Sequence, residues 1–81
     1  MKITNQENIK IEVNKAYQVT GFSDQCPMNY IHRLLAFGFI PGAKFNVLRI
    51  APLGNPYEIE IQGVKVSLRK SELDLIQVKA V

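Results

Sequence analysis

Residues 57–68 read YEIEIQGVKVSL, and no other stretch of the chain says more about its architecture. Apolar residues stand at odd positions before Gln62-Gly63 and at even positions after it. Two short strands joined by a two-residue turn would bring these apolar rows to one face. Alternation of this kind is typical of strands that bury one face. The stretch therefore predicts an antiparallel β-hairpin lying over a hydrophobic core.

Alternation elsewhere predicts further strands. It covers residues 9–13, resumes at 17–20 and returns at 76–80 near the end of the chain. Residues 52–56, PLGNP, force a loop before the hairpin. After the hairpin, residues 71–74, SELD, resemble a capping box that opens a single helical turn.

The strand predicted over residues 44–50 changes phase within its length. The apolar pair Phe45 and Val47 is followed by the pair Leu48 and Ile50. Such a change indicates either a bulge or a strand that is buried on both faces.

Between Pro27 and Gly38 the apolar period becomes that of a helix. On a helical wheel the apolar residues fill one half, and His32 and Arg33 lie on the other. Pro27 suits the first helical position, and Gly38 suits the left-handed residue that ends a helix. The sequence therefore predicts one amphipathic helix of about three turns. Its apolar half consists of Met28, Tyr30, Ile31, Leu34, Leu35 and Phe37.

These elements together predict a mostly β fold. Five or six short strands, with connections too short for parallel crossovers, favour a strongly curved antiparallel sheet. A small, partly open β-barrel with the α-helix covering one barrel mouth is the economical arrangement. The expected core comprises Val19, Phe22, Ile31, Leu35, Phe45, Val47, Ile59, Ile61, Val66, Leu68 and Ile76.

Length and composition agree with one globular unit. The 81 residues are 47% hydrophobic and 21% charged, which suits a single domain over residues 1–81 whose first eight residues are loose. No apolar run is long enough to span a bilayer, and Cys26 has no partner for an internal disulfide. We therefore expect a cytoplasmic location. The net charge of +3 comes from scattered basic residues, which does not favour nucleic-acid binding.

The sequence offers little catalytic or metal chemistry. Cys26 and His32 are the only classical soft or borderline ligands, and Asp24 could join them only in a weak site. Cys26 has no evident acid and base partners, and the glycines lack the Lys and Ser/Thr of a phosphate-binding loop. We expect no enzyme activity, no metal site and no cofactor.

Recognition of a partner is the better hypothesis. Aromatic residues at the rim of the helix and apolar residues of the 52–56 loop would line a groove if helix and loop meet. Sealing the barrel mouth is an equally good explanation for them. Arg69-Lys70 could contact a phosphate or an acidic partner, although a charged strand end that discourages aggregation is the commoner reason for such a pair. The predicted partner-binding residues are Tyr30, Arg33, Phe37, Leu53, Pro56 and Tyr57.

Two stretches, LLAFGFIPG at 34–42 and VLRIAPLGNP at 47–56, together with VSLRK at 66–70, resemble the FeoA family, the small ferrous iron transport protein A. The resemblance covers residues 16–78. Cys26 departs from it, standing where a Ser, Thr or Asp would cap the helix better, and the segment before Ala16 shows no family pattern. The resemblance implies an SH3-like barrel, a cytosolic location and a partner, the membrane transporter FeoB with its cytosolic GTP-binding domain.

The resemblance leads to a functional hypothesis. It predicts a non-enzymatic accessory protein that binds FeoB, is peripheral to the membrane through that partner, and modulates transport or the GTPase cycle. The alternative is an SH3-like regulatory or nucleic-acid-binding module related to the C-terminal domains of metal-dependent repressors. No helix-turn-helix accompanies the barrel here, and the charge is dispersed. An exposed strand edge leaves self-association open.

Overall fold

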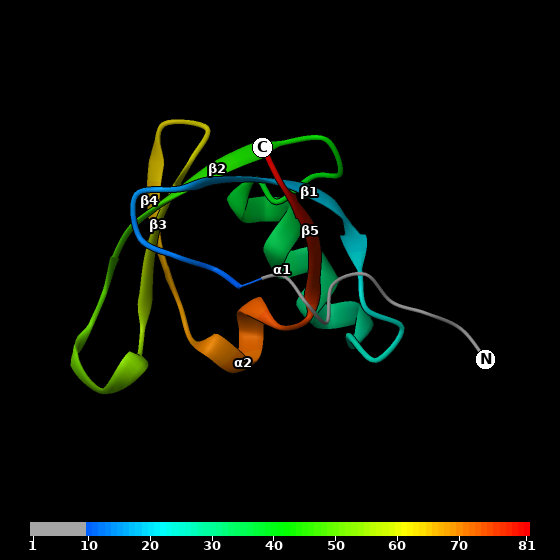
Figure 1. Cartoon of the computed structure of the whole chain (residues 1–81). Helices are drawn as coiled ribbons and strands as arrows, with labels where there is room; N and C mark the ends of the chain where they lie inside the picture. Colours follow the sequence, from blue (N-terminus) through cyan, green and yellow to red (C-terminus); the bar gives the residue numbers. More distant parts are fainter. Residues whose placement is uncertain (1–9) are drawn as a thin grey trace.

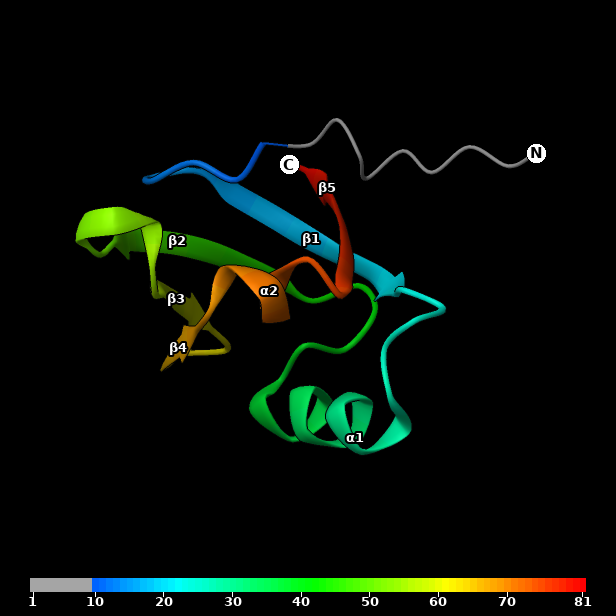
Figure 2. The same cartoon turned by 90° about the horizontal axis from the view of Figure 1, so that it is seen from below.

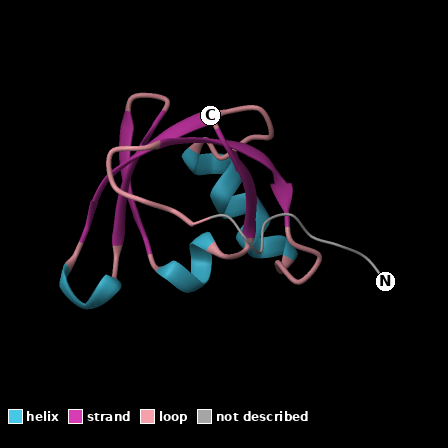
Figure 3. Cartoon of the chain, in the orientation of Figure 1, coloured by secondary structure: helices cyan, strands magenta, loops and turns pink. Residues whose placement is uncertain are grey.

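The computed structural model describes residues 10–81, and these confirm the mostly β fold (Figures 1 and 3). Within these residues, five antiparallel strands form one sheet in the order β4-β3-β2-β1-β5. The elements are β1 (Ala16–Phe22), α1 (Met28–Phe37), β2 (Lys44–Ile50), the 3-10 turn η2 (Pro52–Gly54), β3 (Tyr57–Ile61), β4 (Val64–Leu68), α2 (Lys70–Leu73) and β5 (Ile76–Ala80).

The sheet curves without closing. Its edge strands β4 and β5 do not pair with each other, so the barrel is partly open, and α1 lies across the molecule from β1 (Figure 2). The register shifts between Val19 and Gly21 and again between Val47 and Arg49. Such bulges bend a strand and increase its twist. The phase change predicted in β2 is therefore a bulge, and Leu48 is exposed there rather than buried on a second face.

The β3–β4 hairpin forms as predicted. Ile61 pairs with Val64 across a two-residue turn. Gln62 and Gly63 have φ values of 53° and 78°. Two successive positive φ values define the type I′ turn, whose twist matches that of the strands on either side.

The core differs from expectation mainly at the helix. Only Leu34 of α1 is buried, whereas Leu35, predicted as core, is 37% exposed. Ile31 and Phe22 are half-buried and pack against the core. Phe39, which was not predicted, is completely buried, and its ring meets that of Phe45 edge-on at 5.8 Å. The predicted core residues Val19, Phe45, Val47, Ile59, Ile61, Val66, Leu68 and Ile76 are all buried.

The strand predicted over residues 9–13 is wrong as far as it can be followed. Ile9 lies outside the described residues, and residues 10–13 belong to no strand. The Tyr17 hydroxyl accepts a hydrogen bond from the Glu12 N–H and donates one to the Lys10 carbonyl, both at 2.9 Å. Backbone groups that a neighbouring strand would have paired are thus paired by one side chain instead.

The helix ends follow local chemistry. Pro27 is the N-cap of α1 and not its first helical residue, so the helix begins one residue later than predicted, at Met28. Gly38 is the left-handed C-cap with φ 107°, as expected. The capping box, however, lies elsewhere: α2 is capped at Arg69, whose backbone N–H donates to Glu72 Oε1 at 2.8 Å. Ser71 lies inside this turn and does not cap it. Within residues 10–81, no helix is long and apolar enough to cross a membrane.

Candidate partner-binding surface

Three of the predicted residues lie together on α1, and we call them the helix patch: Tyr30, Arg33 and Phe37. The Arg33 guanidinium carbon lies 5.7 Å from the centre of the Tyr30 ring and 5.8 Å from that of Phe37. Both distances are within the range of cation–π attraction. The two rings therefore attract an exposed cation that lies over both of them.

The helix patch is bonded to α2. The Tyr30 hydroxyl donates a hydrogen bond to Glu72 Oε2 at 2.6 Å, while Glu72 Oε1 accepts the Arg69 N–H. The hydrogen bond to Glu72 raises the pKa of Tyr30. The same bond, followed by that from the Arg69 backbone, lowers the pKa of Glu72. Sequence reasoning noticed the SELD turn but missed this role of Glu72, because nothing local indicates its contact with α1.

A shallow hollow of about 230 Å³ lies beside this hydrogen bond. Pro27, Leu75 and the Tyr30 ring supply its apolar lining, and Ser71 and Glu72 supply polar groups. Both Glu72 oxygens already accept hydrogen bonds. The hollow has the size to hold a small side chain, and both oxygens of its carboxylate take part in bonds within the protein.

The second exposed feature is the loop tip at Leu53. This side chain is fully exposed, at 103%, and its backbone has φ 74°. The loop is held by bonds from Ala51 N–H to the Pro56 carbonyl and from Gly54 N–H to the Ala51 carbonyl, both 3.0 Å. Asn55 Oδ1 accepts the Lys70 N–H at 2.7 Å, which ties the loop to α2. The loop therefore displays a leucine on a constrained backbone.

Helix and loop do not line one groove. The loop tip and α1 lie well apart in both views (Figures 1 and 2), and α2 is hydrogen-bonded to each of them. Tyr57, predicted to bind a partner, is only 8% exposed and belongs to the core. Pro56 is half-buried at the base of the loop. The predicted surface is thus two separate features, the helix patch and Leu53.

The candidate metal ligands do not gather. Cys26 is buried, and burial raises the pKa of its thiol, whereas His32 is exposed on α1. Among residues 10–81, no three His, Cys, Asp or Glu side chains are placed to hold a metal ion together.

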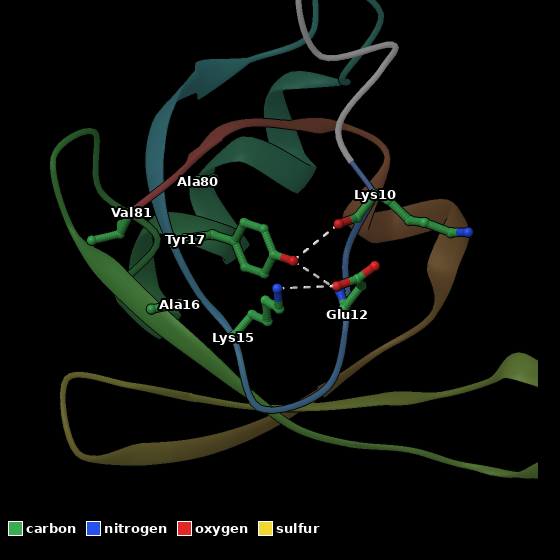
Figure 4. Close-up of a pocket in the computed structure, with 7 residues that line it drawn as sticks. All are labelled: Lys10, Glu12, Lys15, Ala16, Tyr17, Ala80 and Val81. Carbon is green, nitrogen blue, oxygen red and sulfur yellow. Dashed lines mark hydrogen bonds and ion pairs between the residues drawn. The ribbon is translucent and has the colours of Figure 1, made fainter.

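A larger hollow, of about 520 Å³, lies beside Tyr17 (Figure 4). Its polar groups are directed at one another: the Tyr17 hydroxyl bonds the Lys10 and Glu12 backbone, and Lys15 Nζ lies 3.5 Å from Glu12 Oε1. These contacts fasten residues 10–15 to β1. Because they satisfy each other, they leave no convergent group for a ligand.

The described fold is that of a small, mostly β SH3-like barrel, and comparison with known proteins defines its family. A family model, the FeoA domain, matches residues 10–80. The chain therefore belongs to the FeoA family, which is associated with ferrous iron transport.

Solved structures agree with this assignment. The FeoA protein of Chlorobium tepidum is 30% identical, with a TM-score of 0.80 over 89% of this chain and 67% of that one. Iron(II) transport protein A of Clostridium thermocellum is 28% identical, with a TM-score of 0.81 over 89% of this chain; the match spans 43% of the Clostridium chain. Stenotrophomonas maltophilia FeoA, a zinc complex described as a prokaryotic SH3 domain protein, shares the fold with a TM-score of 0.74 at 21% identity, over 86% of this chain and 85% of that one.

Proposed function

We propose that this chain is a non-enzymatic cytosolic accessory protein of ferrous iron uptake, which binds the transporter FeoB and modulates its transport or GTPase cycle. Membership of the FeoA family supports the link to ferrous iron transport. The absence of a gathered metal site within residues 10–81 favours a role through contact with a partner over a role in carrying iron.

The observation that carries the proposal is the conformation of Leu53. A left-handed backbone costs a leucine roughly 1–2 kcal/mol, and full exposure adds apolar surface in water. Neither feature benefits the isolated fold. Burying the side chain in a partner would contribute about 1.5–3 kcal/mol. Because the loop is already constrained, little conformational entropy would be lost on binding.

The helix patch supplies a second contact of different chemistry. Arg33 forms no salt bridge within the described part of the chain, and its position over two rings suits bidentate pairing with a carboxylate. The helix patch is bonded to α2 through Tyr30, and the loop that carries Leu53 is bonded to α2 through Asn55. We infer that FeoB contacts both features.

Binding to nucleic acid has less support. Lys15, Arg49 and Lys70 each lie within 4.0 Å of an acidic side chain, which lowers the positive potential around these three residues. Phosphate-driven binding requires a continuous basic surface and falls steeply with salt. A DNA or RNA titration at two salt concentrations checks this alternative directly.

The test measures binding to detergent-solubilised FeoB, with and without a GTP analogue, by surface-immobilised interferometry. We expect Leu53→Asp and Leu53→Asn to weaken binding roughly tenfold, about the loss of one buried leucine. Asn adopts the left-handed conformation readily, so Leu53→Asn separates loss of the side chain from loss of the loop. Leu53→Met keeps an apolar side chain and should bind nearly as well as the wild type.

The result against the proposed surface would be wild-type affinity in Leu53→Asp, Arg33→Ala and their combination. Tyr57 is unsuitable as a probe because removing a buried ring would damage the core. Modulation needs a second measurement, since a ligand shifts an equilibrium only by its difference in affinity for the two states. Equal affinity for FeoB with and without the nucleotide analogue would contradict modulation of the GTPase cycle while leaving binding intact.

A further inference from the structure

Strand β4 ends the sheet with an unpaired backbone edge. In the β3–β4 hairpin, a two-residue turn makes Ile61 and Val64 a hydrogen-bonded pair, and bonded pairs then alternate along the ladder. The N–H and C=O groups of Lys65 and Ser67 consequently face away from β3. Among residues 10–81 no backbone bond from outside the hairpin reaches them. Among the strands that the structure describes, none lies beyond β4 in the sheet (Figure 2).

The side chains along this edge are basic on one face. Lys65, Ser67 and Arg69 alternate along extended backbone, since Arg69 has φ −76° and ψ 155°, and all three are exposed. Lys65 and Arg69 are therefore about 13 Å apart on the same face. Neither forms a salt bridge within the described residues, whereas the adjacent Lys70 pairs with Asp74 at 3.3 Å.

The opposite face of the same strand is apolar. Val66 and Leu68 are buried in the core, but Val64, at the turn end of this row, is 52% exposed. An added strand would cover part of Val64. The edge thus combines free backbone groups, one apolar contact and two cations, four residues apart, that form no salt bridge within the described residues, although Lys65 lies opposite Glu60 of β3.

We propose that the edge Val64–Arg69 binds an extended, acidic peptide segment of a partner protein, which adds to the sheet as a sixth strand beyond β4. Backbone bonds to Lys65 and Ser67 supply the pairing, as in other cases of strand addition. Two carboxylates of the bound segment, four residues apart, lie opposite Lys65 and Arg69. The residues between them alternate, with apolar side chains next to Val64 and Val66. This site shares no residue with Leu53 or the helix patch and does not depend on FeoB being the partner.

Charge favours an acidic segment over a second copy of the chain. Two β4 edges paired about Val66 would place Lys65 opposite Ser67 of the other copy and the two Lys65 residues on the diagonal. Diagonal side chains lie about 7–8 Å apart, so like charges would repel. Lysine on an edge strand commonly discourages self-pairing for this reason.

The test uses a fluorescein-labelled peptide of sequence Val-Glu-Val-Ser-Val-Glu-Val and fluorescence anisotropy at low salt. We expect Ser67→Pro to weaken binding at least tenfold, because it removes an outward N–H, a change that edge strands tolerate. Ser67→Ala keeps that N–H and should bind within about twofold of the wild type. Replacing both peptide glutamates by lysine should abolish binding, and added salt should weaken binding of the acidic peptide.

Hydrogen exchange of the wild-type protein gives a readout that needs no variant. The amides of Lys65 and Ser67 should exchange more slowly when the peptide is bound, while those of Val64 and Val66 are protected already. Protection elsewhere, or wild-type peptide binding by a folded Ser67→Pro variant, would overturn the proposal. So would an absence of peptide binding, including the case in which sedimentation shows that β4 joins two copies of this chain.

Discussion

Tyr30 on α1 and Glu72 on α2 are joined by a hydrogen bond of 2.6 Å across 42 positions of the sequence. Glu72 also accepts the Arg69 N–H, so one carboxylate caps a helical turn and holds a neighbouring helix. We predict that Tyr30→Phe lowers the midpoint of thermal unfolding and leaves the strands intact by circular dichroism. An unchanged melting curve would mean that the contact adds nothing to stability.

The same pair predicts a pH dependence at both ends of the range. The hydrogen bond from Tyr30 lowers the pKa of Glu72, so its contribution is complete above the usual glutamate value of about 4.3 and is lost as the pH falls through the folded pKa. The pKa of Tyr30 shifts in the opposite direction, and so its contribution to stability is lost at high pH. Its bond to Glu72 raises its pKa, so that contribution is complete below about pH 10 and is lost as the pH rises through the folded pKa. Urea unfolding across pH 3–11 should show that the free energy of unfolding of the wild type decreases at both low and high pH. Both decreases should be smaller in Tyr30→Phe.

Leu34 is the side chain through which α1 enters the core. It is 2% exposed, while Leu35 is 37% exposed. Leu34→Ala should reduce the free energy of unfolding by about 2–5 kcal/mol, the usual cost of a cavity at a buried leucine. Leu35→Ala is the matched control and should cost less than about 1 kcal/mol. Equal losses in urea titrations would show that the two positions are buried alike in solution.

Alanine variants of Gly38 and Gly42 distinguish the effect of backbone strain from the effect of steric crowding. Both have positive φ, 107° and 97°, so an alanine at either is strained. A Cβ at Gly38 would also lie 3.2 Å from Gln62 Cγ, whereas one at Gly42 meets nothing within 4 Å. Gly42→Ala should therefore cost roughly 1 kcal/mol and Gly38→Ala more. Gln62→Ala removes the Cγ atom, so in a double-mutant cycle Gly38→Ala should cost less free energy of unfolding, closer to the cost of Gly42→Ala.

The hairpin turn predicts a gain in stability. Gln62 has φ 53° at the first central position of a type I′ turn, where Asn is much preferred. Gln62→Asn should raise the free energy of unfolding by about 0.5 kcal/mol, and Gln62→Val should lower it. Chemical denaturation of the two variants checks the order, and a more stable valine variant would contradict it.

The features that could be predicted from the sequence are those set by neighbouring residues. The alternation around Gln62-Gly63 determines the hairpin, because two residues with positive φ suit only one kind of turn. Gly38 marks the end of α1 because a left-handed C-cap favours glycine. The bulge in β2 was indicated, although a strand buried on both faces was equally consistent with the sequence. The turn and the helix end can be predicted from neighbouring residues alone, without knowledge of contacts between distant segments.

The errors concern contacts between distant segments. The apolar arc of α1 is broad enough to include both Leu34 and Leu35, and the curved sheet receives only the narrower stripe centred on Leu34. Phe39 follows the helix, where its burial depends on the direction the chain takes after Gly38. Residues 10–13, predicted as part of a strand, instead have backbone groups that are hydrogen-bonded to the Tyr17 hydroxyl. None of these outcomes can be computed from spacing alone.

The candidate surface was predicted in part. Tyr30, Arg33 and Phe37 were correctly grouped by their helical spacing, and Leu53 was correctly placed in a loop. The sequence made one groove conditional on helix and loop meeting, and in the structure the loop tip lies well apart from α1 (Figures 1 and 2). The binding roles of these residues stay predictions.

The sheet order also bears on synthesis. Strand β1 pairs with both β2 and β5, and Tyr17 and Gln18 each have one partner in β2 and one in β5, the last strand along the chain. A ribosome releases β1 roughly sixty residues before β5, and until then β1 has one side without its neighbour. Assembly of the barrel must therefore finish after translation has passed Ala80, and a nascent chain halted earlier would offer that bare strand to chaperones or to other unfinished chains.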